Sequence, residues 1–277
     1  MISTYVIKEK QSLYSYLKSR FISDKVINLL IDKKLVERQN ELLLADTNLF
    51  ESDIITINYS GLETNIKQDT NKGPINIIYE NSEIICLDKT EEILIHSDGS
   101  SKENLLAKTV NYLKAKGDDS YLRVVHRIDV KTRGIVVFAK NIVSYQEISR
   151  QLETNTVIRK YLAVVWGMIN TKKTLVFAIG RDRHNSNKYL VTKKGKEAIT
   201  IINPLKHKKD KTLLEIYIKT GRTHQIRFSL AHIGHNIVGD DLYGKDEKNK
   251  LMLVSKQFGF ILDNQKYLLE SKIKLEV

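Results

Sequence analysis

The sequence has one cysteine, two prolines and no long hydrophobic run, and these shortages exclude several classes of protein. A lone cysteine cannot build a disulfide framework or a cysteine-based zinc site. Cys86 lies in an apolar run, so we expect a buried thiol rather than a nucleophile. No stretch approaches the roughly eighteen apolar residues that a membrane-spanning helix needs, and the N-terminus lacks the features of an export signal. These absences favour a cytoplasmic protein that makes no membrane contact.

What is present is enough apolar sequence for a large core. The 277 residues are 42% hydrophobic and 28% charged, a composition that excludes a mostly disordered chain. This length suggests one large domain with a small additional module.

The net charge of +12 is distributed unevenly along the chain. Residues 1–73 carry ten basic and ten acidic side chains, so the whole excess belongs to residues 74–277. A basic excess of this size favours a polyanionic partner, nucleic acid above all, although a lysine-rich soluble protein has the same composition. We therefore expect an anion to bind mainly the larger part.

A polar stretch that ends at Pro74 indicates a domain boundary. We predict an N-terminal module at residues 1–66, a linker at 67–74 and a catalytic domain at 75–277. Within the module, apolar residues at three- and four-residue spacing predict helices over 12–21 and 24–35. Short strands are expected at 42–44 and 54–59.

The predicted module resembles the S4 RNA-binding module in its order of two helices followed by a β-hairpin. Its helical half, residues 8–38, holds eight basic and four acidic side chains, which suits an RNA backbone as well as an ordinary solvated helix face. The candidate RNA-binding residues in it are Lys18, Arg20, Lys25, Lys33 and Lys34.

Strand-like segments dominate the larger part, and helical segments interrupt them without a regular alternation. This pattern predicts an α+β fold, in which a mixed, largely antiparallel central sheet has flanking helices. The expected strands are 75–79, 84–87, 134–139, 161–166, 197–202 and 213–219, and the expected helices are 102–116, 142–152 and 224–232.

The densest polar cluster, residues 126–134, leads directly into an apolar strand. Its carboxylate, Asp129, has Arg127, Lys131 and Arg133 nearby in the sequence, and nearby cations favour the ionised form of a carboxyl group. An ionised aspartate at the mouth of a strand can act as a nucleophile or a base. A salt-bridged loop aspartate is the alternative interpretation.

A second cluster, residues 220–227, places a glycine turn between a strand and a helix. The N-terminus of a helix attracts anions through its free backbone N–H groups. Arg227 lies one turn beyond Thr223, on the same helix face.

These two clusters are the first and last of four motifs in which the sequence resembles the RluA/RluD-type RNA pseudouridine synthases, enzymes that isomerise uridine within RNA. The family patterns H-R-L-D-x-x-T-S-G, K-x-Y-x-A-x-V-x-G, G-K-x-A-x-T and T-G-R-T-H-Q-I-R match residues 126–134, 159–167, 195–200 and 220–227 in that order. The resemblance spans roughly residues 75–260, and an S4-like module upstream is common in this family.

The resemblance implies the pseudouridine synthase fold and a role for individual residues. Asp129 would be the catalytic aspartate, Tyr161 would stack on the target base and Arg227 would pair with Asp129. The implied substrate-binding residues are His126, Arg127 and Arg222. The reaction is a redox-neutral isomerisation, so we expect no metal and no cofactor.

The expected partner is RNA bound by a monomer, and ribosomal RNA of the large subunit is favoured over tRNA. Two other functions stay open. One is a non-catalytic RNA-binding or ribosome-assembly factor with the same fold. The other is a nucleosidase or glycosidase, which usually needs a second carboxylate as general acid, and no such partner is evident in the sequence.

Overall fold

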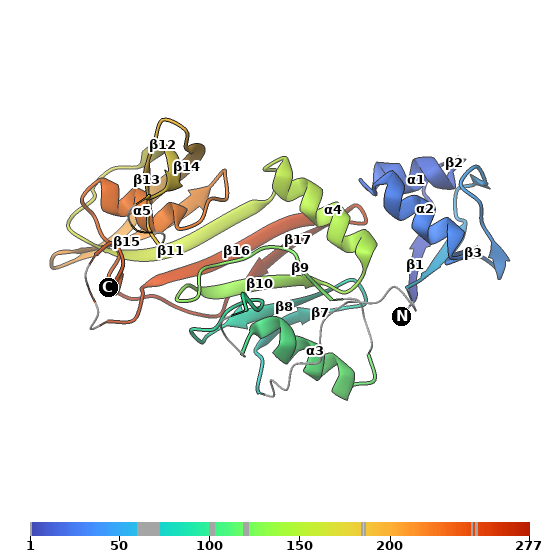
Figure 1. Ribbon diagram of the computed structural model, residues 1–277, viewed down its shortest axis with the longest axis horizontal. Coiled ribbons are helices and arrows are strands. Elements are labelled where there is room, and N and C mark those ends of the chain that lie inside the picture. The colour runs from blue at the N-terminus through green and yellow to red at the C-terminus, as the bar shows by residue number, and fades with distance from the viewer. Residues whose placement is uncertain are drawn as a thin grey trace.

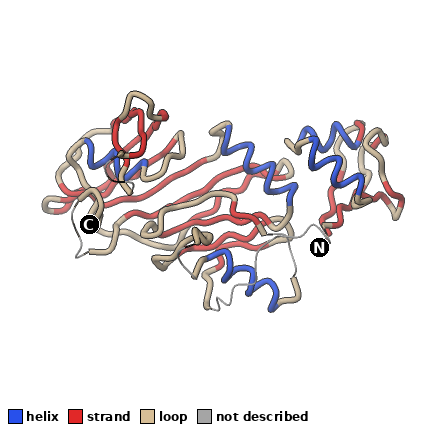
Figure 2. Tube along the Cα trace, in the orientation of Figure 1, coloured by secondary structure: helices blue, strands red, loops and turns tan. Residues whose placement is uncertain are grey.

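A computed structural model describes residues 2–59, 73–99, 103–118, 122–183, 185, 187–244, 246 and 249–277. A long sheet crosses the larger unit, and the small N-terminal unit lies at one end of it (Figures 1 and 2). Most of the expected linker, residues 67–72, falls outside the described residues.

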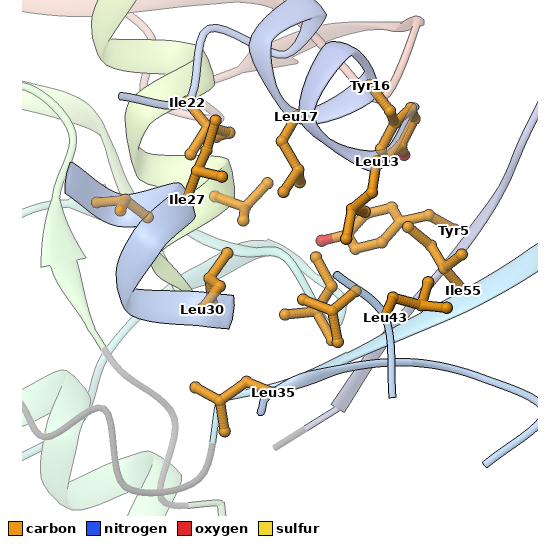
Figure 3. Close-up of a cluster of buried hydrophobic side chains, with 14 of the residues drawn as sticks. Tyr5, Leu13, Tyr16, Leu17, Ile22, Ile27, Leu30, Leu35, Leu43 and Ile55 are labelled. Atoms are coloured by element: carbon orange, nitrogen blue, oxygen red, sulfur yellow. The ribbon is translucent and has the colours of Figure 1, made fainter. Parts of the chain in front are cut away.

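The N-terminal unit packs two helices, α1 (Leu13–Ser19) and α2 (Asp24–Asp32), on a small antiparallel sheet (Figure 3). Helix α1 begins where the Ser12 hydroxyl accepts a hydrogen bond from the backbone N–H of Ser15. Both predicted helices are confirmed, although each ends earlier than expected. The sheet order is β1 (Ile2–Val6), β6 (Ile54–Asn58), β3 (Val36–Arg38) and β4 (Glu41–Leu42), and β2 (Gln11–Ser12) pairs with β5 (Asn48–Leu49).

The larger unit is built on an eleven-stranded sheet, which confirms the mixed, largely antiparallel prediction. Among the described pairs of strands, only β10–β16 is parallel, and one isolated parallel bridge joins Leu94 to Asn104. The main order is β13 (Tyr189–Val191), β12 (Lys173–Arg181), β14 (Lys196–Lys208), β15 (Lys211–Ile218), β11 (Ile158–Trp166), β16 (Leu253–Leu262), β10 (Arg133–Ala139), β8 (Ile84–Lys89) and β7 (Ile77–Glu80), with β9 (Arg123–Val124) on β10 and β17 (Gln265–Glu270) on β16.

Helices cover both faces of the sheet at β10, which explains why this strand is apolar at successive positions. Helix α4 (Ile142–Glu153) contributes Ile148 to the cluster that contains Val137, whereas α3 (Leu105–Ala115) packs on the face that contains Phe138. A strand that is buried on both faces cannot alternate apolar and polar residues. The third helix, α5 (Gln225–His232), lies beside β12 and β14.

The N-terminal unit is joined to the larger unit by a buried contact with α4. Val143 belongs to the core of the N-terminal unit, and the guanidinium of Arg20 lies 2.7 Å from the carboxylate of Glu147. Arg20 also stacks over the ring of Tyr5, at 4.3 Å from its centroid. The expectation that Arg20 contacts RNA is therefore corrected, because its side chain is only 6% exposed and is held by this interface.

Candidate active site

The two motif clusters line one cleft of about 950 Å³ in the larger unit. The turn before β10, strand β11 and the connection from β15 to α5 each contribute side chains to it. All six predicted catalytic and substrate-binding residues are among the lining residues: His126, Arg127, Asp129, Tyr161, Arg222 and Arg227.

The first two motifs lie beside each other in the sheet, because the first ends on strand β10 and the second runs along β11, with β16 between them. Ser255 of β16 pairs with Gly134 on one side and with Tyr161 on the other. Gly134 has φ +107°, and a Cβ there would lie 2.3 Å from the carbonyl oxygen of Ser255, so only glycine fits this crossing. Strand β16 has one extra residue, Lys256, opposite the step from Lys160 to Tyr161, so the alternation of β11 continues through Tyr161.

The side chain of Arg227 is clamped by Asp240, a residue outside the predicted site. Asp240 is fully buried and accepts two hydrogen bonds of 2.8 Å from Arg227 Nε and Nη2. Burial alone would lower the pKa of Arg227, but the hydrogen bond and the charge of Asp240 leave it raised. Arg227 Nη1 lies 3.9 Å from Asp129 Oδ2, so the expected pair with Asp129 is an ionic contact and the firm partner is Asp240.

Two of the three cations that flank Asp129 in the sequence contact other residues. Lys131 donates to Asp241 at 2.8 Å, and Arg127 lies 3.4 Å from His96. The expectation that Arg127 and Lys131 are the charges beside Asp129 is therefore corrected, because the guanidinium facing its carboxylate is that of Arg227.

A buried lysine supports the turn that carries Asp129. Lys89 is 1% exposed, and its Nζ donates to the backbone carbonyls of Glu91, Ile93 and Val130. Burial lowers the pKa of Lys89 to about 8, although the charge of Asp129 opposes the shift. Because one of these carbonyls belongs to Val130, Lys89 fixes the residue that follows Asp129 in the sequence.

Tyr161 has a buried hydroxyl-bearing ring on the floor of the cleft. It is 8% exposed, and burial raises its pKa, while the charge of Arg159 and a hydrogen bond with Ser255 oppose the shift. The phenol therefore stays protonated at neutral pH.

His126 is held as a neutral ring. It stacks on Phe258 with 4.2 Å between ring centroids, and its Nε2 accepts the backbone N–H of Val137 at 3.3 Å. Burial, aided by the charge of Arg159, lowers the pKa of His126 to about 3. The acceptor role of Nε2 leaves the proton of the neutral ring on Nδ1.

The loop before α5 holds the remaining predicted residue, Arg222. Its Nε donates to the carbonyl of Glu197 at 2.9 Å, and its backbone N–H donates to Gln225. Nearby His224 has left-handed backbone geometry with φ 55°, and its Nε2 lies 4.0 Å from Asp129 Oδ2. Burial lowers the pKa of His224, and the charge of Asp129 opposes the shift.

Sequence reasoning missed Asp240 as a site residue. The signal was the run 239–244 after the fourth motif, Gly-Asp-Asp-Leu-Tyr-Gly. Among the described residues, no cluster of histidine, cysteine and acidic side chains has the arrangement of a metal site, and no helix could span a bilayer.

Comparison with known proteins identifies the family. The model of the family described as RNA pseudouridylate synthase matches residues 83–232. The chain belongs to this family. It is 32% identical over 251 residues to the uncharacterized RNA pseudouridine synthase YhcT of Bacillus subtilis, covering 88% of this chain and 83% of that one.

A second relative is the ribosomal large subunit pseudouridine synthase D of Buchnera aphidicola, with 34% identity over 73% of this chain and 64% of the relative. Among solved structures, human RNA pseudouridylate synthase domain containing 1 superposes with a TM-score of 0.62 at 20% identity, over 74% of this chain and 91% of that one. This likeness shows the same fold. The chain is therefore an RNA pseudouridine synthase, which is an isomerase.

Proposed function

We propose that this synthase isomerises a uridine of large-subunit ribosomal RNA and that Asp129, Tyr161 and Arg227 carry the reaction. The observation that supports the residue roles is the position of Asp129 in the cleft, 3.9 Å from an arginine that Asp240 holds in place. The support for the RNA class is the name of several relatives, ribosomal large subunit pseudouridine synthase D.

The proposed chemistry begins with the ionised carboxylate of Asp129. It either attacks C1′ of the ribose or assists elimination at C2′, and the C1′–N1 bond breaks. The released uracil turns, C5 bonds to C1′ and the hydrogen at C5 leaves as a proton. Because Asp240 already satisfies two donors of Arg227, the guanidinium keeps its place while the charge on Asp129 changes.

Tyr161 supplies the surface on which the uracil rests while it turns. Stacking on an aromatic ring is worth roughly 1–3 kcal/mol per base. Turning the nucleotide out of the RNA costs a few kcal/mol, and this cost is smallest in single-stranded loops. Arg127 and Arg222, at the rims of the same cleft, would contact the RNA around the target.

We further propose that the N-terminal unit is an S4-like RNA-binding module. Its two helices expose lysines, and the fixed contact with α4 gives those lysines a constant position relative to the cleft. Lys18 Nζ lies 3.1 Å from Asp24 Oδ1, so this carboxylate partly neutralises its charge. The remaining predicted contacts are the exposed residues Lys25, Lys33 and Lys34.

The proposed target is tested with two RNA pools labelled with tritium at C5 of uridine. One is an unmodified transcript of the host large-subunit ribosomal RNA, and the other is a pool of unmodified tRNA transcripts. Formation of pseudouridine expels the C5 hydrogen, so the proposal predicts release from the ribosomal transcript alone. Release from tRNA alone would overturn the RNA class, and release from neither would overturn activity on both free RNAs.

A further inference from the structure

One buried cation in the cleft has no part in the chemistry described above. Arg159 stands two residues before Tyr161 on β11 and is 9% exposed. Its Nη2 donates to the Asn155 side chain at 3.1 Å and to the carbonyl of Lys219 at 2.8 Å. These two hydrogen bonds fix the plane of the guanidinium.

The neighbouring loop leaves room for this guanidinium. A Cβ at Gly221 would lie 2.7 Å from Arg159 Nη1, so any other residue there would displace the group. The buried Nε–H of Arg159 has no acceptor among the described residues. The surrounding residues thus orient the guanidinium of Arg159 but do not accept hydrogen bonds from all of its N–H groups.

The charge of Arg159 is also uncompensated. None of the ion pairs among the described residues involves Arg159 or its neighbour Arg222. Burial lowers the pKa of Arg159, the nearby Tyr161 opposes this, and the charge of Arg222 lowers it further, with no carboxylate contributing. A buried charge without a counter-ion is costly, and it is normally paired or bound to a ligand. Both arginines line the cleft, so a ligand in the cleft can supply the missing negative charge.

We propose that Arg159, with Arg222, binds a phosphodiester of the RNA backbone next to the target uridine. The proposal rests on the proposed function, since it takes the base to lie on Tyr161. Residues 159 and 161 point to the same face of the strand, about 7 Å apart, a separation comparable to one nucleotide. Both hydrogens of Arg159 Nη2 already go to Asn155 and Lys219, so Nη1 is the group that donates to a phosphate oxygen, in a charge-assisted hydrogen bond.

Two substitutions test this site in different ways. Arg159→Gln removes the charge. Asn155→Asp keeps the shape of the side chain 3.1 Å from Arg159 Nη2 but places a competing carboxylate there. Asn264→Asp is the matched control, because it adds the same negative charge at an exposed turn. The backbone of Asn264 has φ 60°, close to the 56° of Asn155.

The measurement is the affinity for the large-subunit transcript as a function of KCl concentration. We expect Arg159→Gln to weaken binding by roughly tenfold to a hundredfold, the range for a hydrogen bond to a charged group. The plot of log K against log salt concentration has a negative slope, and the magnitude of this slope should decrease by about 0.7, the value for one phosphate of a single strand. Asn155→Asp should lower the slope in the same direction, and Asn264→Asp should leave it unchanged.

A wild-type slope for both Arg159→Gln and Asn155→Asp would overturn the phosphate site. If Arg159→Gln fails to fold, as judged by its thermal unfolding, Asn155→Asp decides alone. Tritium release by the wild-type protein is measured on the same transcript. Its absence would overturn the proposed activity on this transcript, whereas the salt slopes still decide the role of Arg159, so the two failures are distinguishable.

Discussion

Two places in the molecule contain a buried arginine held by a carboxylate: the contact between the two units and the candidate active-site cleft. The arginine has a different setting in each. At the contact, Arg20 pairs with Glu147 and stacks on Tyr5, and the pair closes the interface. In the cleft, Arg227 pairs with Asp240 and still faces a second carboxylate, Asp129. A closed pair fixes structure, whereas an arginine that keeps a free side can act on a reacting group.

Among the substitutions that separate these two arginine pairs, the largest effect is expected from Asp240→Asn, which breaks the clamp in the cleft. Arg227 would lose its buried counter-ion and swing towards Asp129, and a displacement of about 1 Å at a reacting group can cost roughly a hundredfold in rate. We expect kcat for tritium release to fall by at least about this factor while RNA affinity changes little. A kcat within twofold of wild type would show that the clamp does not position Arg227.

Glu147→Gln breaks the corresponding pair at the contact between the units. Both side chains are at least nine-tenths buried, so the free energy of unfolding should fall by about 3–5 kcal/mol. Urea unfolding measures this loss, and kcat of the folded fraction should stay near the wild-type value. The double variant Arg20→Met with Glu147→Leu should recover most of the stability, because no charge is then left buried. A large loss of kcat in Glu147→Gln would mean that the contact also serves the cleft.

The pH dependence of Lys89 separates stability from activity. Its folded pKa of about 8 lies below the ordinary value of 10.5, so the unfolded chain binds more protons between these two pH values and stability rises with pH there. Activity should instead decline above about pH 8, because a neutral amine has too few protons for three carbonyls. Rates of tritium release between pH 7 and pH 10 test this decline. Lys89→Met should lower the plateau and remove the decline, and an unchanged decline in that variant would assign it to another group.

The smallest effect is expected from the exposed lysines of the N-terminal unit. The double variant Lys25→Gln with Lys34→Gln should weaken RNA binding by a few-fold and reduce the salt slope by about 0.7 for each phosphate that the variant no longer neutralises. Salt-dependent binding to the large-subunit transcript measures both. The exchange Lys266→Gln with Lys274→Gln, on the larger unit, is the matched control. Equal slopes for the two double variants would argue against an S4-like role for the unit.

The sequence predicted helices and strands well where the spacing of apolar residues within one segment determines the structure. The helices near 13–19, 24–32 and 142–153 and the strand at 133–139 follow apolar spacing, and the structure has them. Strand β16 was not predicted, although it joins β10 to β11, because its parallel pairing with β10 depends on residues more than a hundred positions apart. Local patterns carry no information about such a pairing.

The site shows the same division between local and distant information. Motifs placed Asp129, Tyr161 and Arg227 in one cleft, but sequence proximity suggested Lys131 as a partner of Asp129, whereas Lys131 binds Asp241. Arg20 was assigned to RNA from charge alone, and its burial against a helix 127 positions away was invisible in the sequence.

The proposed role of Asp129 as the reacting carboxylate of this cleft is tested by comparing two neighbouring aspartates. Asp129→Asn and Asp241→Asn remove the same charge from the same cleft, where both carboxylates lie within 4 Å of Arg227. Tritium release is measured under single-turnover conditions with RNA bound to each variant. We expect a loss of roughly a thousandfold or more for Asp129→Asn and release within about tenfold of wild type for Asp241→Asn. Sustained release by Asp129→Asn would show that another group reacts with the ribose.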